Sequence, residues 1–133
     1  MELVCFRFHD TEHHATQYFD YLRLRKKFYV DQLGWPIWHD FGLEQDQYDN
    51  PCAAFALIKK GPRVVAGARL LPDHASCFGW SHMLKDVALG KIDTIPNDAP
   101  GNVTNFDGLW ECSRLVVDED ALCAQERRTA LGM

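Results

Sequence analysis

Three carboxylates stand close together in a polar stretch near the middle of the chain. Glu44, Asp46 and Asp49 fall within six residues. Their mutual repulsion destabilises a folded loop unless a cation lies among them. A hard metal ion is one such cation. A positively charged organic ligand is another, since the nearby Trp35 and Trp38 offer aromatic faces to it. A solvated acidic surface loop is the alternative, because charge runs usually lie in water.

A second group of polar side chains stands at the start of an apolar stretch. Glu111, Ser113 and Arg114 directly precede the run Leu-Val-Val. Charged groups that enter a buried strand cost free energy unless they are paired. In an extended chain Glu111 and Ser113 share one face and Arg114 points to the other, unless a bulge intervenes. Glu111 is therefore a candidate general base, and the alternative is a structural ion pair with Arg69 or Arg25.

Two arginines also stand in patterned segments. Arg69 lies within an apolar, strand-like run, where a buried guanidinium requires a carboxylate or phosphate partner. Arg25 lies in a predicted helix, where a surface position beside Lys26 and Lys27 is the alternative. The six histidines show no metal-ligand spacing, and the five cysteines include no CxxC pair. We therefore expect no metal site and no thiol nucleophile.

The elements that carry these side chains alternate between strands and helices. Apolar alternation and apolar runs predict strands over residues 3–8, 53–59, 63–71 and 109–117. A long helix is expected to start with Thr11 as its cap and to end before Gly34 and Pro36. Shorter helices are predicted over residues 81–86 and 119–131. Residues 35–52 and 97–108 lack a period and are read as loops, and long loops in compact domains are often functional.

Composition sets the class of protein. The chain has 133 residues, 47% of them hydrophobic and 25% charged, which is typical of one globular domain. The formal net charge of −5 argues against a nucleic-acid partner. No apolar run is long enough to span a bilayer, and the N-terminus lacks the apolar stretch of a signal peptide. Irregularly spaced cysteines indicate reduced thiols, so we expect a cytoplasmic protein without membrane partners.

Four motifs in order resemble the acyl-homoserine-lactone (autoinducer) synthase family of the LuxI type. They occupy residues 24–27 with 33–35, 42–49, 67–72 and 110–117, and together they span roughly residues 22–118. The resemblance implies an α/β (α+β) fold similar to the GNAT acyltransferases, with a mixed sheet flanked by helices. It implies one autoinducer-synthase domain over residues 1–133 that corresponds to the N-terminal portion of the family's domain. Family members continue with further strands, so the strand over 109–117 is expected to be an exposed edge.

The resemblance also implies a reaction. In the family, the amine of S-adenosylmethionine (SAM) attacks the thioester of an acyl carrier protein or of acyl-CoA. Lactone closure then expels methylthioadenosine, and the product serves quorum sensing. SAM is a substrate in this reaction, so no cofactor is expected.

Site residues follow from the same resemblance. It assigns SAM binding to Arg25, Tyr29, Trp35, Glu44, Asp46 and Asp49. It assigns catalysis to Glu111, Arg114 and Arg69, and contact with the acyl or pantetheine group to Ser113 and Arg114. Glu111 matches the glutamate that promotes deprotonation of the amine. Tyr29 stands where the family usually has phenylalanine, and its hydroxyl group needs a partner if it is buried.

Two other functions remain open from the sequence. A different GNAT-like acyltransferase would move an acyl group from CoA to another amine without SAM. That function leaves the acidic, tryptophan-rich segment unexplained. A non-catalytic remnant of the synthase would bind SAM without turnover.

Overall fold

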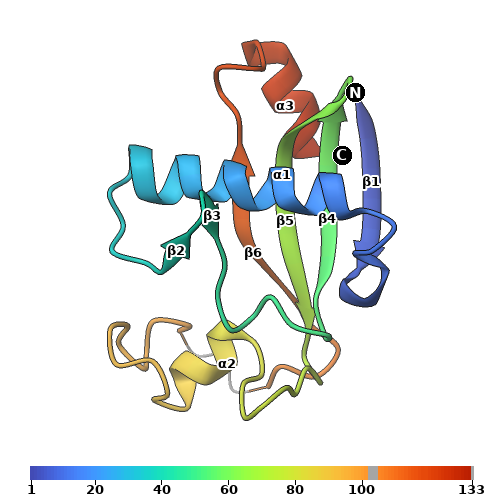
Figure 1. Ribbon diagram of the computed structural model, residues 1–133. Coiled ribbons are helices and arrows are strands. Elements are labelled where there is room, and N and C mark those ends of the chain that lie inside the picture. Colours follow the sequence, from blue (N-terminus) through green and yellow to red (C-terminus); the bar gives the residue numbers. More distant parts are fainter. Residues whose placement is uncertain (102–104, 133) are drawn as a thin grey trace.

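The computed structural model describes residues 1–101 and 105–132, and it is built on one four-stranded sheet (Figure 1). The strands lie in the order β1 (Glu2–Arg7), β4 (Ala54–Lys60), β5 (Arg63–Pro72) and β6 (Trp110–Val117). All three pairings are antiparallel, so the expected mixed sheet is antiparallel throughout the described residues. The strand β6 lies at one edge of the sheet, as expected from the sequence.

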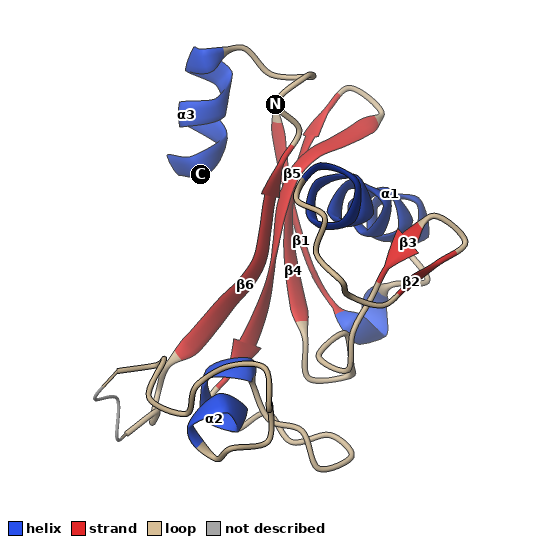
Figure 2. Cartoon of the chain, turned by 90° about the vertical axis from the view of Figure 1, so that its left-hand side faces the viewer, coloured by secondary structure: helices blue, strands red, loops and turns tan. Residues whose placement is uncertain are grey.

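Helices cover both faces of this sheet. The helix α1 (Ala15–Arg25) and its π-helical continuation η2 (Lys26–Gln32) cross one face, and α3 (Ala124–Gly132) lies on the other (Figure 2). The short helix α2 (Met83–Ala88) lies beyond one end of the sheet. No helix within residues 1–101 and 105–132 is long and apolar enough to cross a membrane. The predicted α/β fold with flanking helices is confirmed.

The first helix differs in detail from its prediction. A short 3-10 turn, η1 (Phe8–Asp10), comes first, and the hydroxyl group of Thr11 donates to the carbonyl oxygen of Phe8 at 2.8 Å. Thr11 therefore closes this turn, and the helix begins only at Ala15. The expected single helix also divides, because hydrogen bonds with π-helical spacing replace the α-helical ones after Arg25. Such π-helical segments occur often at functional sites.

The predicted loops are largely irregular. The stretch over 35–52 contains one small hairpin, formed by β2 (His39–Asp40) and β3 (Leu43–Glu44). The stretch over 97–108 has no helix or strand in its described part, and residues 102–104 lie outside the described residues. The hairpin of β4 and β5 and the strand β6 follow their predicted ranges to within about one residue.

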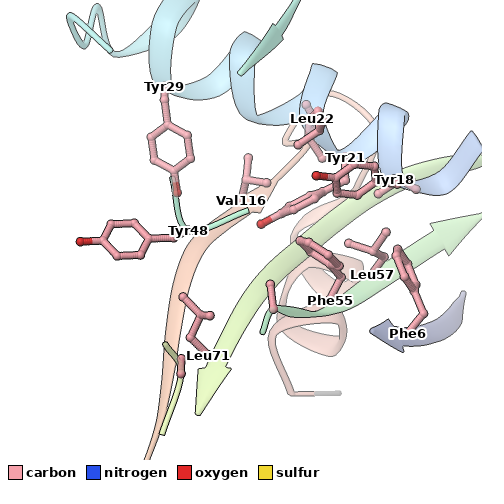
Figure 3. Packing of buried hydrophobic residues seen from close by; sticks show 14 residues of the cluster. Phe6, Tyr18, Tyr21, Leu22, Tyr29, Tyr48, Phe55, Leu57, Leu71 and Val116 are labelled. Atoms are coloured by element: carbon pink, nitrogen blue, oxygen red, sulfur yellow. The ribbon is translucent and has the colours of Figure 1, made fainter. Parts of the chain in front are cut away.

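The main core lies between α1 and the sheet (Figure 3). Tyr21 and Leu22 of α1 are almost fully buried against Phe55 and Leu57 of β4. Gly67 of β5 makes this close approach possible, because an added Cβ atom there would lie 2.6 Å from Leu57 and 2.8 Å from Tyr21. The absence of a side chain therefore sets the distance between α1 and β5.

A smaller core lies on the opposite face of the sheet. Ile58 and Val65 point to this face and pack with Leu122, which precedes α3, and with Ala130 of α3. Their sequence neighbours Leu57 and Val64 belong to the main core, as expected for successive residues in a strand. The central strands are thus buried on both faces, which explains their nearly continuous apolar sequence.

Candidate functional site

The acidic segment, residues 44–49, lies beside the C-terminal end of α1, and Arg25 is its first partner. Arg25 donates from Nε to Glu44 at 2.5 Å, and from Nη1 and Nη2 to the two carboxylate oxygens of Asp49 at 2.8 and 3.0 Å. The side chain of Arg25 is 0% exposed. It therefore lies inside the protein with its charge compensated, and the alternative of a surface position beside Lys26 and Lys27 is wrong.

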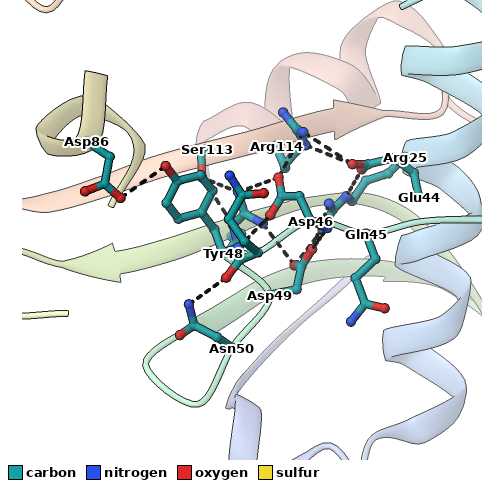
Figure 4. Close-up of polar contacts among 12 residues, drawn as sticks. Arg25, Glu44, Gln45, Asp46, Tyr48, Asp49, Asn50, Asp86, Ser113 and Arg114 are labelled. Atoms are coloured by element: carbon teal, nitrogen blue, oxygen red, sulfur yellow. Dashed lines mark hydrogen bonds and ion pairs between the residues drawn. The ribbon is translucent and has the colours of Figure 1, made fainter. Parts of the chain in front are cut away.

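Two further arginines complete the neutralisation of the three carboxylates (Figure 4). Arg69 of β5 donates to Asp46 at 2.5 Å and lies 3.1 Å from Asp49. Arg114 of β6 lies 2.9 Å from Asp46 and 3.3 Å from Glu44. Opposite charges thus alternate around a closed ring, which we call the charge ring. Its members, in order, are Arg25, Glu44, Arg114, Asp46, Arg69 and Asp49.

The charge ring corrects the interpretation of the acidic segment. Three carboxylates were expected to require a bound metal or organic cation, yet three guanidinium groups of the chain already balance them. The alternative of a solvated acidic loop is also wrong, because Glu44 is 0% and Asp49 is 7% exposed. No cluster of three or more potential metal ligands occurs among the residues that the structure describes.

Burial and ion pairing shift the pKa values of the buried ring members in opposite directions. Burial by itself would raise the pKa of the Asp49 carboxyl group, but Arg25 and Arg69 outweigh it, so that the pKa is lower than usual. Burial would likewise lower the pKa of Arg25, and the carboxylate of Asp49 more than offsets this. Asp49 and Arg25 therefore both stay ionised near neutral pH.

A β-bulge in β6 brings Arg114 into the ring. Arg114 has a φ of +53°, and the register between β5 and β6 shifts between Gly67 and Arg69. The hydroxyl group of Tyr21 donates to the carbonyl oxygen of Arg114 at 2.8 Å. The hydroxyl group of Tyr29 donates to the carbonyl oxygen of Leu115 at 2.7 Å. The bulge turns Arg114 toward the acidic segment, where a regular strand would point it to the other face.

The carbonyl oxygen of Leu115 is the partner that the Tyr29 hydroxyl group requires. The aromatic ring of Tyr29 lies 5.4 Å from the guanidinium carbon of Arg114 and 4.9 Å from the ring of Trp35. Tyr29 thereby connects the bulge, the charge ring and the tryptophan-rich segment.

A cavity of about 830 Å³ opens beside the charge ring. The acidic segment and β6 form its polar wall. Its apolar wall comes from η2 and residues 35–38 on one side, and from α2 and residues 92–95 on the other. Among the lining residues are Tyr29, Trp35, Trp38, Glu44, Asp46, Tyr48, Met83, Ile92, Ile95, Cys112, Ser113 and Arg114. Volume and lining are typical of a site for a small organic molecule.

The site residues expected from the sequence fall into three sets. One set lines the cavity: Tyr29, Trp35, Glu44, Asp46, Ser113 and Arg114. A second set, Arg25, Asp49 and Arg69, is buried behind it in the charge ring. Ser113 joins the two sets, because its hydroxyl oxygen accepts from Arg69 at 3.3 Å. The third set is Glu111 alone.

Glu111 lies apart from the charge ring, under the first turn of α2. Its Oε2 atom accepts a hydrogen bond from the backbone of Leu84 at 2.7 Å and lies 3.3 Å from Nδ1 of His82. The proposed ion pair of Glu111 with Arg69 or Arg25 does not form, because carboxylates of the acidic segment occupy both arginines. Glu111 is next in the chain to Cys112, which lines the cavity.

Sequence reasoning missed two buried polar residues near the cavity. His82 is 2% exposed and Asp86 is 0% exposed. Asp86 accepts hydrogen bonds from Ser81 at 2.7 Å and from the hydroxyl group of Tyr48 at 3.2 Å. It thereby ties α2 to the acidic segment. A polar residue within the apolar period of a short helix was the available signal for Asp86, whereas nothing in the sequence distinguished His82 from the exposed histidines.

Comparisons with known proteins agree with this architecture. The family model for autoinducer synthases matches residues 9–131. An acyl-homoserine-lactone synthase of Aeromonas hydrophila is 31% identical over 100 residues, which are 74% of this chain and 42% of that protein. The chain thus spans less than half the length of this relative.

Solved structures show the same fold. The acyl-homoserine-lactone synthase LasI superposes with a TM-score of 0.64 at 18% identity, over 98% of this chain and 63% of that one. The CoA-dependent acyl-homoserine lactone synthase BjaI, solved with SAM and isopentyl-CoA, superposes with a TM-score of 0.60 at 22% identity. That match covers 89% of this chain and 51% of BjaI. With its fold and nearly its whole length matched, this chain belongs to the autoinducer synthase family.

Proposed function

We propose that this chain binds SAM in the cavity beside the charge ring and acylates the amine of SAM as part of an acyl-homoserine-lactone synthase. The observation that carries the proposal is the cavity itself, which combines aromatic walls with a charge-balanced polar wall. Relatives named acyl-homoserine-lactone synthase, and a solved synthase with SAM in its structure, support the choice of ligand.

Aromatic rings account for recognition of the sulfonium group. Because the charge ring is balanced by its own arginines, it offers no uncompensated negative charge to the ligand. Trp35, Trp38 and Tyr29 line the opposite wall, and aromatic faces attract a cation. Arg114 is the ring arginine that lines the cavity, and its guanidinium group has further N–H donors for the carboxylate group of SAM.

The buried members of the ring have a positioning role in this proposal. Arg25, Asp49 and Arg69 do not line the cavity, so they act by fixing Glu44, Asp46 and Ser113, which do. Asp46 is held by Arg69, by Arg114 and by the backbone amide group of Tyr48 at 2.9 Å. Its carboxylate orientation is therefore set before a ligand arrives.

Acyl transfer requires that the amine first lose a proton. In the proposal the proton passes to the buried carboxylate of Glu111. The amine nitrogen then attacks the thioester carbon, and the thiol of the carrier leaves. The carboxylate of the acylated SAM next attacks its own γ-carbon, closes the lactone and expels methylthioadenosine. Ser113 and Arg114 face the acyl or pantetheine group from β6.

The acyl donor is an acyl carrier protein or acyl-CoA. The CoA-dependent relatives among the solved structures support the second of these. All five cysteines are free thiols, which agrees with action in the reducing cytoplasm.

The test is release of methylthioadenosine by the complete protein that carries this sequence. SAM is supplied with a panel of acyl-CoA and acyl carrier protein thioesters of different chain lengths. We expect one methylthioadenosine for each acyl-homoserine lactone formed, with one donor preferred. Acyl transfer to another amine without SAM would instead identify a different GNAT-like acyltransferase, and SAM binding without turnover on any donor would identify a non-catalytic protein.

A further inference from the structure

Glu111 forms a buried pair with His82, a residue outside the site predicted from the sequence. His82 is the residue that precedes α2, and it is 2% exposed, with its ring packed edge-on against Phe106 at 5.1 Å between centroids. The Glu111 side chain is 3% exposed. Both groups are thus excluded from water, where a polar atom without a partner is costly.

The hydrogen bonds to this pair favour one arrangement of its protons. The backbone amide of Leu84 donates to Oε2 of Glu111, and the backbone amide of Lys85 donates to Nδ1 of His82 at 3.3 Å. Because Nδ1 accepts this bond, a neutral imidazole carries its hydrogen on Nε2. Oε2 and Nδ1 then face each other as two acceptors 3.3 Å apart.

Two acceptors at this distance leave room for one more proton between them. A proton on the carboxyl group would convert the contact into an O–H···N hydrogen bond and remove the repulsion between the lone pairs. A proton on Oε2 of Glu111 has Nδ1 as an acceptor at 3.3 Å, whereas a proton on Oε1 would have no acceptor among the described residues.

We propose that His82 is a positioning residue for the proton acceptor of the reaction. The proton that leaves the ammonium group of SAM forms an O–H bond on Glu111 and comes to rest between Oε2 and Nδ1 of His82. The N–H bond of the ammonium group breaks, and its electron pair stays on the amine nitrogen as the nucleophile. This inference rests on the proposed function, and it deepens the role of Glu111 in it.

Two substitutions separate this role from helix capping. In His82→Asn the side-chain oxygen takes the place of Nδ1, so it can accept from Lys85 and from protonated Glu111. In His82→Ser the hydroxyl group still caps α2 but is too short to reach Glu111. Asparagine and serine are both good caps, and both remove the ring that packs on Phe106.

Measurement of kcat and of KM for SAM in the complete protein tests the proposal. We expect His82→Asn to keep kcat within about threefold of the original and His82→Ser to lower kcat at least about tenfold, with KM for SAM nearly unchanged in both. Equal losses of kcat in the two variants would overturn the positioning role, because the lost packing on Phe106 would then account for both. A fall confined to KM would also overturn it.

A spectroscopic measurement tests the same idea without turnover. The ¹⁵N chemical shifts of the His82 ring in the resting protein are expected to show a neutral ring protonated at Nε2. A ring that carries hydrogen on Nδ1 would overturn the proposal, even if the enzyme is active. Absence of methylthioadenosine release from the original protein, with the expected ring protonation observed, would instead show that the proposed function is wrong.

Discussion

At the scale of single residues, the most consequential feature is that six charged side chains compensate one another, four of them buried in the protein interior. Asp49 is the most constrained of the carboxylates, because Arg25 binds both of its oxygens and Arg69 lies 3.1 Å away. Buried charges are tolerated only while every partner is present.

Removal of the Asp49 charge is therefore expected to destabilise the protein strongly. Asp49→Asn leaves Arg25 and Arg69 buried with one carboxylate too few, and we expect a loss of about 3–5 kcal/mol in the free energy of unfolding. Urea denaturation measures this loss. The matched control is Asp20→Asn, which removes an exposed pair with Arg23 and should cost about 0.5 kcal/mol or less. Similar losses in the two variants would show that the charge ring does not constrain the fold.

Glu111 is expected to affect the rate and not the binding of SAM. Glu111→Gln keeps the size of the side chain and removes its ability to hold the transferred proton, so acylation should slow about 100-fold or more. The affinity for SAM should change little, because Glu111 takes up the proton only in the acylation step. Single-turnover kinetics and calorimetric titration measure the two quantities. A large loss of affinity would reassign Glu111 to ligand binding.

Residue types and motif spacing predicted which side chains gather, but not how they pair. The acidic segment was recognised from its composition, and Arg69 was expected to need a carboxylate or phosphate partner. The sequence alone could not show that Arg25, Arg69 and Arg114 converge on the same three carboxylates, since they come from α1, β5 and β6. That convergence depends on the packing of α1 across the sheet and on a bulge in β6.

At the scale of elements, the bulge in β6 is stabilised by hydrogen bonds from α1 and η2. Tyr21 and Tyr29 donate to the carbonyl oxygens of Arg114 and Leu115, which a regular ladder with β5 would otherwise engage. The left-handed conformation of Arg114 costs about 1 kcal/mol, and these two bonds offset it.

Tyr29→Phe tests this connection between η2 and β6. Loss of the hydroxyl group leaves the carbonyl oxygen of Leu115 without its donor, and we expect a destabilisation of about 1–2 kcal/mol. SAM affinity should also fall, because Arg114 depends on the bulge for its position. Thermal denaturation and calorimetric titration measure the two effects. Tyr18→Phe is the control, since the Tyr18 hydroxyl group only accepts a longer bond of 3.3 Å from Gln45. An unchanged affinity would show that the bulge persists without Tyr29.

Element boundaries could be predicted where the pattern is local. Apolar runs located β4, β5 and β6, and the Lys-Gly-Pro segment located the turn between the first two. The start of α1 was predicted too early because Thr11 serves a 3-10 turn. The π-helical segment and the bulge had no local signal, because tertiary hydrogen bonds from Tyr21 and Tyr29 accompany them.

At the scale of the whole molecule, buried carboxylates make stability depend on pH. The pKa of Asp49 is lowered by its arginines against the effect of burial, and the pKa of Asp86 is lowered by its hydrogen bonds with Ser81, also against burial. A carboxyl group with a lower pKa in the folded state stabilises the fold at pH values above its unfolded pKa of about 3.9. That contribution disappears as the pH falls through the folded pKa.

We therefore expect the free energy of unfolding to be nearly constant from about pH 7 to pH 5 and to fall steeply below about pH 4. Urea denaturation at a series of pH values measures this curve. In Asp86→Asn the free energy of unfolding should fall less steeply below pH 4, because one of these two buried carboxyl groups no longer titrates. A slope that stays the same in this variant would exclude Asp86 as a source of the acid sensitivity.

The central claim is that SAM occupies the cavity between the charge ring and the aromatic wall, and calorimetric titration with SAM tests it most directly. Trp35 lines that cavity, whereas Phe78 is 96% exposed on a separate turn. We predict saturable one-to-one binding that Trp35→Leu weakens about tenfold and Phe78→Leu leaves unchanged. Equal affinities in the original protein and in Trp35→Leu, or the absence of any SAM binding to the complete protein, would contradict the account.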